Sequence, residues 1–517
     1  MKSLLLLSAF LLAAQAGLVA QPSSKRAYRE QRAALIAKAG AESFDHDLRL
    51  TAEEKKANAK FVRLRDSLLD AAKRNGNFPW ARYFYGAQND INQSPMFSLL
   101  QKMPKAAITH LHTSATGSMR WVVRTAIAEP NCFVRWTIAR DTTGKATGGT
   151  YQSVIDPAGI GTIAFFKPGT EPAGFVSAGV LASTVWGFAD SLYNLLTFGQ
   201  AMGDDTAHVW KAFEERFDRI DGFDSYRPMF KQYYRMAFDS LIADGVQVVE
   251  LRAGLGTLYD LDHPSRAKDG YYTKDTTLAL FRELQNEIRK DHPEFTLKII
   301  YCGYRFASVD QITADLARAF RMRKKNPDMI KGYDLVGEED AGYSTLFYLD
   351  AWLKSDSLAR VYGIDMPFYF HDGETDRPDV ENLYDAVLLH SRRIGHGFNL
   401  FQYPSLVAAV KKQDICIEVS PLSNQILGYV RDLRIHPACG LLRQGVQYTI
   451  SSDDPGIFGY SGLTYDYWSA VMAWNLDLRA VKKLLLNSFT YGTLSTRERT
   501  AAVHEFEKRW LRFIRGI

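Results

Sequence analysis

The chain has 517 residues, of which 46% are hydrophobic and 23% are charged, and it contains no long low-complexity tract. This composition is typical of a folded globular protein and excludes a largely disordered chain. The net charge is only +5 and the basic residues are scattered along the chain, so nucleic acid is not expected as a partner.

The N-terminus has the layout of a cleavable signal peptide. Lys2 precedes an apolar run from Leu4 to Leu12, and small residues follow as far as Ala20. Residues 1–20 are therefore predicted to direct the protein to the periplasm or to the outside of the cell. No later segment has about 18 uninterrupted apolar residues, so no membrane span is expected.

Residues 21–95 are predicted to form an N-terminal helical arm. Within it, Lys25–Gly76 is charged and strongly helix-forming, and its apolar positions are spaced as one face. These positions are Leu35, Phe61, Leu64, Leu68 and Leu69. The face could pack against the body of its own chain or against a partner, and the pattern alone leaves both arrangements open.

Residues 96–510 are predicted to form an α/β fold, a (β/α)8 TIM-type barrel. Eight short apolar runs bounded by turn signals read as strands, and helical patterns separate most of them. The predicted strands are Ala106–Thr113, Val246–Ala253, Thr296–Tyr304, Met329–Gly337, Met366–His371, Arg393–His396, Ile415–Ser420 and Gln447–Ser452.

About 130 residues separate the first two predicted strands, far more than one crossover helix requires. An insertion after the first barrel strand is therefore expected. Its first part, about residues 129–185, is rich in Gly, Thr, Pro and β-branched residues and is predicted to be a small subdomain that contains strands. Its second part, about residues 205–243, returns to a helical pattern.

Four potential metal ligands follow or end predicted strands, where barrels of this kind hold their active sites. His110 and His112 are two residues apart on one strand, so their rings leave the same face. His371 and Asp453 end two other strands. Three nitrogens and one oxygen leave a position for water, which is typical of a catalytic zinc site. The sequence thus predicts one zinc ion (Zn2+) per chain.

Three further polar residues lie near this ligand set. Glu374 follows His371 by three residues, which suits a general acid beside the metal. His396, between Gly395 and Gly397, is either a buried structural histidine or a ring that reaches a catalytic water. Asp454 adjoins Asp453 and points in another direction, so it could face a substrate.

Several motifs resemble the adenosine deaminase superfamily, and occur in the order seen there. They are Met103-Pro104-Lys105 before the two histidines, Phe370-His371-Asp372-Gly373-Glu374, Arg393-Ile394-Gly395-His396-Gly397, Pro421-Leu422-Ser423-Asn424 and Ser452-Asp453-Asp454-Pro455. The signal peptide, the arm, the insertion and the segment Gly332–Asp340 are more similar to the secreted adenosine deaminase-related growth factor subfamily than to the compact cytosolic enzyme.

The resemblance implies zinc-dependent deamination of adenosine or 2′-deoxyadenosine. His110, His112, His371 and Asp453 would hold the metal. Glu374 would protonate purine N1 while a water attacks C6, and His396 would orient that water and help to deprotonate it. Asp454 would contact N7, and the backbone of Gly337 would lie near N3. Together with the apolar face of the arm, the resemblance also predicts a homodimer.

Three positions depart from the family pattern. The aspartate that usually follows the His-x-His and contacts the ribose is absent, and Thr113-Ser114-Ala115-Thr116 occupies that stretch. Ser420 replaces a cysteine, and Asp372 replaces an alanine beside His371. The alternatives are a deaminase of another 6-aminopurine derivative and a secreted, non-catalytic binding or signalling protein.

Overall fold

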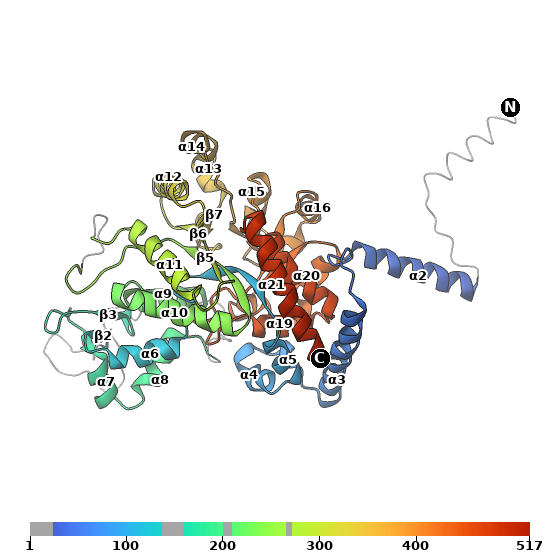
Figure 1. Ribbon diagram of the computed structural model, residues 1–517, viewed down its shortest axis with the longest axis horizontal. Helices are drawn as coiled ribbons and strands as arrows, with labels where there is room; N and C mark the ends of the chain where they lie inside the picture. Colours follow the sequence, from blue (N-terminus) through green and yellow to red (C-terminus); the bar gives the residue numbers. More distant parts are fainter. Residues whose placement is uncertain (1–23, 137–158, 200–208, 265–270) are drawn as a thin grey trace.

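The computed structural model describes residues 24–136, 159–199, 209–264 and 271–517 (Figure 1). The predicted signal peptide, residues 1–20, lies outside the described residues, so export stays a prediction. The central part of the predicted inserted subdomain, residues 137–158, lies outside them as well.

Eight parallel strands form the body of the molecule, arranged as two four-stranded sheets in the orders β1-β5-β6-β7 and β11-β10-β9-β8. Two single bridges, Leu111 to Asp453 and Tyr333 to Phe368, join the sheets and close the barrel. The predicted barrel is therefore confirmed. The strands are β1 (Ala106–His112), β5 (Val246–Ala253), β6 (Thr296–Tyr304), β7 (Ile330–Val336), β8 (His371–Asp372), β9 (Arg393–His396), β10 (Cys416–Val419) and β11 (Tyr448–Ile450).

Helices cover the outside of the barrel because one face of each strand is an apolar surface that needs covering. Those that connect or follow the strands are α10 (Arg227–Ala243), α11 (Lys274–Ile288), α12 (Val309–Lys325), α13 (Leu349–Trp352), α14 (Ser355–Tyr362), α15 (Asn382–Leu388), α16 (Pro404–Lys412), α17 (Pro421–Ile426), α18 (Pro437–Arg443), α19 (Thr464–Ala473), α20 (Leu478–Thr490) and α21 (Thr496–Arg515).

Charged side chains replace part of the apolar core inside the barrel. Every residue of β5 is buried, yet the strand carries Glu250 and Arg252, two residues apart and on one face. Glu418 on β10 and Asp334 on β7 are also fully buried. Isolated buried charges are costly, so these groups have to pair with one another.

The insertion after β1 contains a three-stranded antiparallel sheet in the order β3-β2-β4. Its elements are α6 (Met119–Ala128), β2 (Cys132–Arg135), β3 (Ile163–Phe165), β4 (Phe175–Ser177), α7 (Ala178–Thr184), α8 (Phe188–Leu196) and α9 (Val209–Asp224). Helix α9 packs closely on β3, since a Cβ at Gly222 would lie 2.2 Å from the carbonyl oxygen of Ile163. The three-stranded sheet of the insertion therefore fixes the position of α9.

The N-terminal arm is divided into α2 (Lys25–Glu42), α3 (Ala52–Asn75), α4 (Phe84–Asn92) and α5 (Pro95–Gln101). Helix α3 packs on the barrel: Phe61 is fully buried, and Glu54 accepts hydrogen bonds from Lys482 and Trp510, both at 2.8 Å. Helix α2 has no buried residue and extends away from the body (Figure 1). No helix in the described part is long and apolar enough to cross a membrane.

Candidate metal centre and active site

Four side chains meet at the carboxyl ends of three barrel strands. The Nε2 atom of His112 lies 3.3 Å from Nε2 of His110 and 3.2 Å from Nε2 of His371. Asp453 Oδ1 lies 3.1 Å from Nε2 of His110 and 3.2 Å from Nε2 of His112. The four residues predicted as ligands thus come together in one cluster.

The backbone around the cluster allows the clustered side chains to lie close together. A Cβ at Gly395 would lie 3.2 Å from both the His110 ring and the Cα of His371, so a larger residue there would crowd two of the clustered side chains. Asp453 and His396 both have a φ of 63°, in the left-handed region that non-glycine residues rarely adopt. Backbone strain of this kind is concentrated at functional sites.

Buried carboxylates hold the far sides of two imidazoles. His110 Nδ1 is hydrogen-bonded to Glu418 at 2.8 Å, and His371 Nδ1 lies 2.8 Å from Asp334 Oδ2. Arg252 donates to both Asp334, at 2.7 Å, and Glu418. Because a neutral imidazole has one N–H, these contacts place it on Nδ1 and leave the Nε2 lone pair in the cluster.

Charges around the imidazoles favour this arrangement. Burial alone would raise the pKa of Asp334 and of Glu418, but Arg252 beside both, Arg393 beside Glu418, and hydrogen bonds from the rings of His371 and His110 hold the pKa of both well below the usual range. Burial lowers the pKa of His371 to about 3. Both carboxylates are therefore ionised at neutral pH, while His371 is neutral and free to coordinate a cation.

The cluster fits a metal ion. The Nε2 lone pairs of His110 and His371 and the Asp453 carboxylate share no hydrogen, so at these distances they repel one another unless a cation lies between them. Imidazole nitrogens with one carboxylate oxygen are a donor set that suits zinc.

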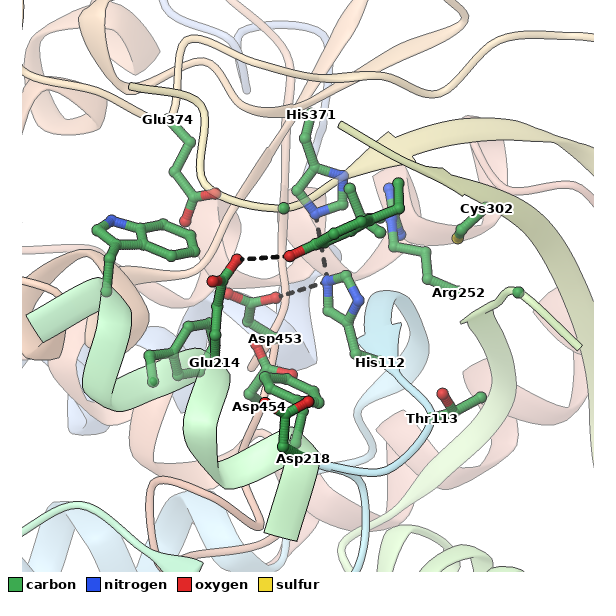
Figure 2. A pocket seen from close by; sticks show the side chains of 17 residues that line it. His112, Thr113, Glu214, Asp218, Arg252, Cys302, His371, Glu374, Asp453 and Asp454 are labelled. Carbon is green, nitrogen blue, oxygen red and sulfur yellow. Dashed lines mark hydrogen bonds and ion pairs between the residues drawn. The ribbon is translucent and has the colours of Figure 1, made fainter. Parts of the chain in front are cut away.

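A cavity of about 300 Å³ opens beside the cluster (Figure 2). His112, His371 and Asp453 line it together with Gly337, Glu374 and Asp454, so six of the eight residues predicted as site residues line one cavity. The remaining two, His110 and His396, are buried against these residues, and His396 Nε2 lies 3.2 Å from Glu374 Oε1.

The carboxyls in the cavity have strongly perturbed acidities. Burial, together with the nearby Asp453, raises the pKa of Glu374 and of Asp454 well above the usual range. Burial lowers the pKa of His396 well below its usual value. Glu374 and Asp454 can therefore hold a proton at neutral pH, which a general acid requires, and His396 is a neutral ring.

The turn that carries Glu374 is fixed by a second buried carboxyl. Glu339 accepts hydrogen bonds from the backbone N–H groups of Gly373, at 3.0 Å, and Glu374, at 2.5 Å. Asp372, which the sequence showed as an added carboxyl beside His371, pairs with Arg305 at 2.9 Å and accepts from Thr345 at 2.6 Å. It thus belongs to a separate network and does not enter the metal cluster.

One wall of the cavity is formed by the insertion, and the residues that form it were not predicted from the sequence. Trp210, Glu214 and Asp218 on α9 line the cavity, and Tyr304 donates to Glu214 at 3.1 Å (Figure 2). Their spacing of four residues places them on one helix face, which is the signal that could have identified them. Ser114, in the stretch that lacks the family's aspartate, donates its hydroxyl to Asp224 at 2.8 Å.

Comparison with known proteins identifies the family. The family model for adenosine deaminase matches residues 222–509, more than half of the chain, and the model for the adenosine/AMP deaminase N-terminal region matches residues 5–100. The chain belongs to the adenosine deaminase family. It is a hydrolase of the adenosine deaminase type, which confirms the resemblance seen in the sequence and argues against the non-catalytic alternative.

Relatives of the adenosine deaminase family match along most of the chain. Adenosine deaminase 2 of Sus scrofa is 34% identical over 90% of this chain and 89% of its own length. The human protein of that name is 32% identical over 94% of this chain and 93% of its own. The N6-mAMP deaminase of Arabidopsis shares the fold, with a TM-score of 0.54 and 16% identity over 80% of this chain and 99% of that protein.

The contact between Asp334 and His371 yields a test of the metal centre. Asp334→Asn should keep the shape of the side chain but remove the negative charge, and loss of such a partner typically lowers metal affinity by roughly 10–100-fold. Competition with a chelator measures the affinity. Asp372→Asn is the matched control, because Asp372 adjoins the same histidine without contacting its ring. Equal affinities in the two variants would contradict the role of Asp334.

Proposed function

We propose that the protein hydrolyses adenosine and 2′-deoxyadenosine to inosine and 2′-deoxyinosine with release of ammonia, using one zinc ion per chain. The observation that carries the proposal is a set of buried polar atoms beside the ligand cluster that have no hydrogen-bonding partner among the described residues. These are Oε1 of Glu374, Nε2 of His396, Oδ1 of Asp453 and Oδ1 of Asp454. A substrate with polar atoms along its edge could satisfy them.

The four clustered residues would hold the zinc ion, a Lewis acid that makes hydroxide available near neutral pH. Hydroxide adds to C6 of the purine while Glu374 donates its proton to N1. The hydroxyl proton then passes to the amino group, the C6–N bond breaks and ammonia leaves. Solvent returns a proton to Glu374. Asp454, held in its protonated form, can donate to N7, and Gly337, which also lines the cavity, would offer its backbone near N3.

The charges on the α9 side of the cavity favour a substrate without a phosphate group. Arg252 is the one lysine or arginine among the described residues that line the cavity, and it already pairs with Asp334 and Glu418. A 5′-phosphate directed toward Glu214 and Asp218 would therefore meet carboxyls and no free cation. Sugar hydroxyls, in contrast, can donate hydrogen bonds to these carboxyls. Ser114 does not line this cavity and its hydroxyl is engaged by Asp224, whereas Glu214 lines the cavity, so Glu214 is the better candidate for sugar recognition.

Glu374→Gln tests the general acid. An amide cannot supply the proton to N1, so the turnover of adenosine, followed by loss of the adenine absorbance, should fall by about 10²–10⁴-fold. The variant should keep its metal. His371→Ala is the comparison, since it should lose both metal and activity. A Glu374→Gln protein with nearly normal turnover would show that another group protonates the purine.

The substrate preference is tested by comparing adenosine with AMP. The wild-type protein should prefer adenosine, and Glu214→Gln should narrow the preference by weakening adenosine turnover and easing the entry of the phosphate. A single charge-assisted hydrogen bond is worth about 1.5–3 kcal/mol, so the kcat/KM for adenosine should fall by at least about tenfold. Glu215→Gln, the neighbouring change on α9, should leave the ratio unchanged. An AMP preference in the wild type would contradict this.

We also propose that α2 contacts a second copy of the chain. Tyr28, Leu35 and Ile36 are 58%, 69% and 55% exposed on a helix without buried residues. Light scattering at micromolar concentration should give the mass of a homodimer, and Leu35→Glu should shift it toward the monomer. Ala37→Glu, about half a turn away from the apolar side, is the matched control. A monomeric wild-type protein would contradict the proposal.

A further inference from the structure

His396 is connected to the backbone of α18 through two buried side chains. The backbone N–H of Ala438 donates to His436 Nδ1 at 3.1 Å. His436 Nε2 lies 3.1 Å from Asn424 Oδ1, and Asn424 Nδ2 lies 3.0 Å from His396 Nδ1. His436 is 3% exposed, Asn424 is fully buried and His396 is 2% exposed, so water cannot substitute for any of these contacts.

The direction of every hydrogen bond in this series follows from its first member. A backbone N–H can only donate, so His436 Nδ1 is an acceptor and carries no hydrogen. The hydrogen of a neutral His436 must then be on Nε2, which donates to Asn424 Oδ1. The amide of Asn424 consequently presents its NH2 group to His396, whose Nδ1 accepts. A neutral His396 therefore has its hydrogen on Nε2.

The opposite orientation of Asn424 is unfavourable at both ends. With the amide reversed, its NH2 group would face the N–H of His436, and its carbonyl oxygen would face the lone pair of His396. Each contact would leave a buried polar group unsatisfied, which disfavours the reversed amide. Burial also lowers the pKa of His436 to about 3, so this ring is neutral and has no second N–H to relieve the conflict.

The Nε2 atom of His396 points to the reacting side of the site. It lies 3.2 Å from Glu374 Oε1 and 3.6 Å from Asp453 Oδ2, and it has no hydrogen-bonding partner in the described part of the chain. An N–H here can donate to an oxygen that enters beside the metal cluster. The same ring has no lone pair on that side, so it cannot accept the proton of that oxygen without a change of tautomer.

We propose that His436 and Asn424 are positioning residues that keep the hydrogen of His396 on Nε2, so that His396 donates a hydrogen bond to the attacking oxygen and does not act as its base. The inference rests on the proposed function for the identity of that oxygen. The donated hydrogen bond stabilises the negative charge on the oxygen as it bonds to C6, and removal of one such donor typically costs about 10²–10³-fold in rate.

Asn424→Asp separates the two roles of His396. A carboxylate accepts at both ends, so it would accept from His396 Nδ1 and transfer the hydrogen of the ring away from Nε2. If His396 is a donor, kcat for adenosine should fall by about 10²–10³-fold with little change in KM and with the metal retained. If His396 is a base, a carboxylate partner makes it a stronger one, and kcat should be kept or increased at low pH. That second result would overturn the proposal.

Two substitutions of His436 show whether the effect depends on hydrogen-bond direction. His436→Gln keeps an N–H donor near the position of Nε2, so Asn424 should stay oriented and kcat should remain near that of the wild type. His436→Leu has a similar bulk but no donor, so Asn424 could reverse and kcat should fall. Equal kcat values for the two variants would overturn the proposal, whether both are high or both are low.

Nitrogen-15 NMR of histidine-labelled wild-type protein reports the tautomers directly. Both His396 and His436 should give the signals of neutral rings protonated on Nε2, and Asn424→Asp should move the hydrogen of His396 to Nδ1. This measurement does not require turnover. A wild-type protein that shows the expected tautomers but does not deaminate adenosine would refute the proposed function alone, whereas an Nδ1-protonated His396 in the wild type would refute the present inference.

Discussion

The guanidinium of Arg252 links the two buried carboxylates that hold the clustered histidines. It pairs with Asp334 and Glu418 inside the barrel and donates to the carbonyl oxygen of Thr109 at 2.7 Å. Each of the two carboxylates holds the far side of a clustered histidine, so one side chain on β5 aligns rings that come from β1 and β8. Removal of one partner from such a buried set leaves an uncompensated charge, which is strongly destabilising.

The closure of the barrel and the formation of the site depend on the same contacts. Each half of the barrel has a full ladder of strand pairing, but the two halves meet at single bridges. One of these bridges contains Asp453, and the backbone N–H of His112 donates to the Asp453 carbonyl at 3.3 Å. Arg393 on β9 adds a link across the interior, because it pairs with Glu250 on β5 of the other half at 2.7 Å. The cluster thus forms where the halves join.

Much of this arrangement could be predicted from the sequence, because parallel strands bring the residues at their carboxyl ends to one side of a barrel. The four clustered residues and Glu374 were found in this way. The partners of the histidines could not be found, since Asp334 and Glu418 lie within buried strands and their contacts join residues far apart in the chain. The sequence showed that the family's ribose-contacting aspartate is absent from the stretch around Ser114, but it could not show that the Ser114 hydroxyl is taken by Asp224. Asn424 was noted only as part of a motif, because its orientation depends on His436.

The charged interior of the barrel has a consequence for the kind of ion it can accept. Glu250, Asp334 and Glu418 pair with the guanidiniums of Arg252 and Arg393, and Asp453 lies against the clustered histidines, which makes four carboxylates and two guanidiniums; the buried Arg305 pairs separately with Asp372. Glu374 and Asp454 add no charge while they are protonated. The set is left with two negative charges, and a divalent cation would make it neutral. A monovalent or trivalent ion would leave a net charge on this buried set, so the charges of these side chains favour a divalent metal, and the ligand geometry then favours one element over another.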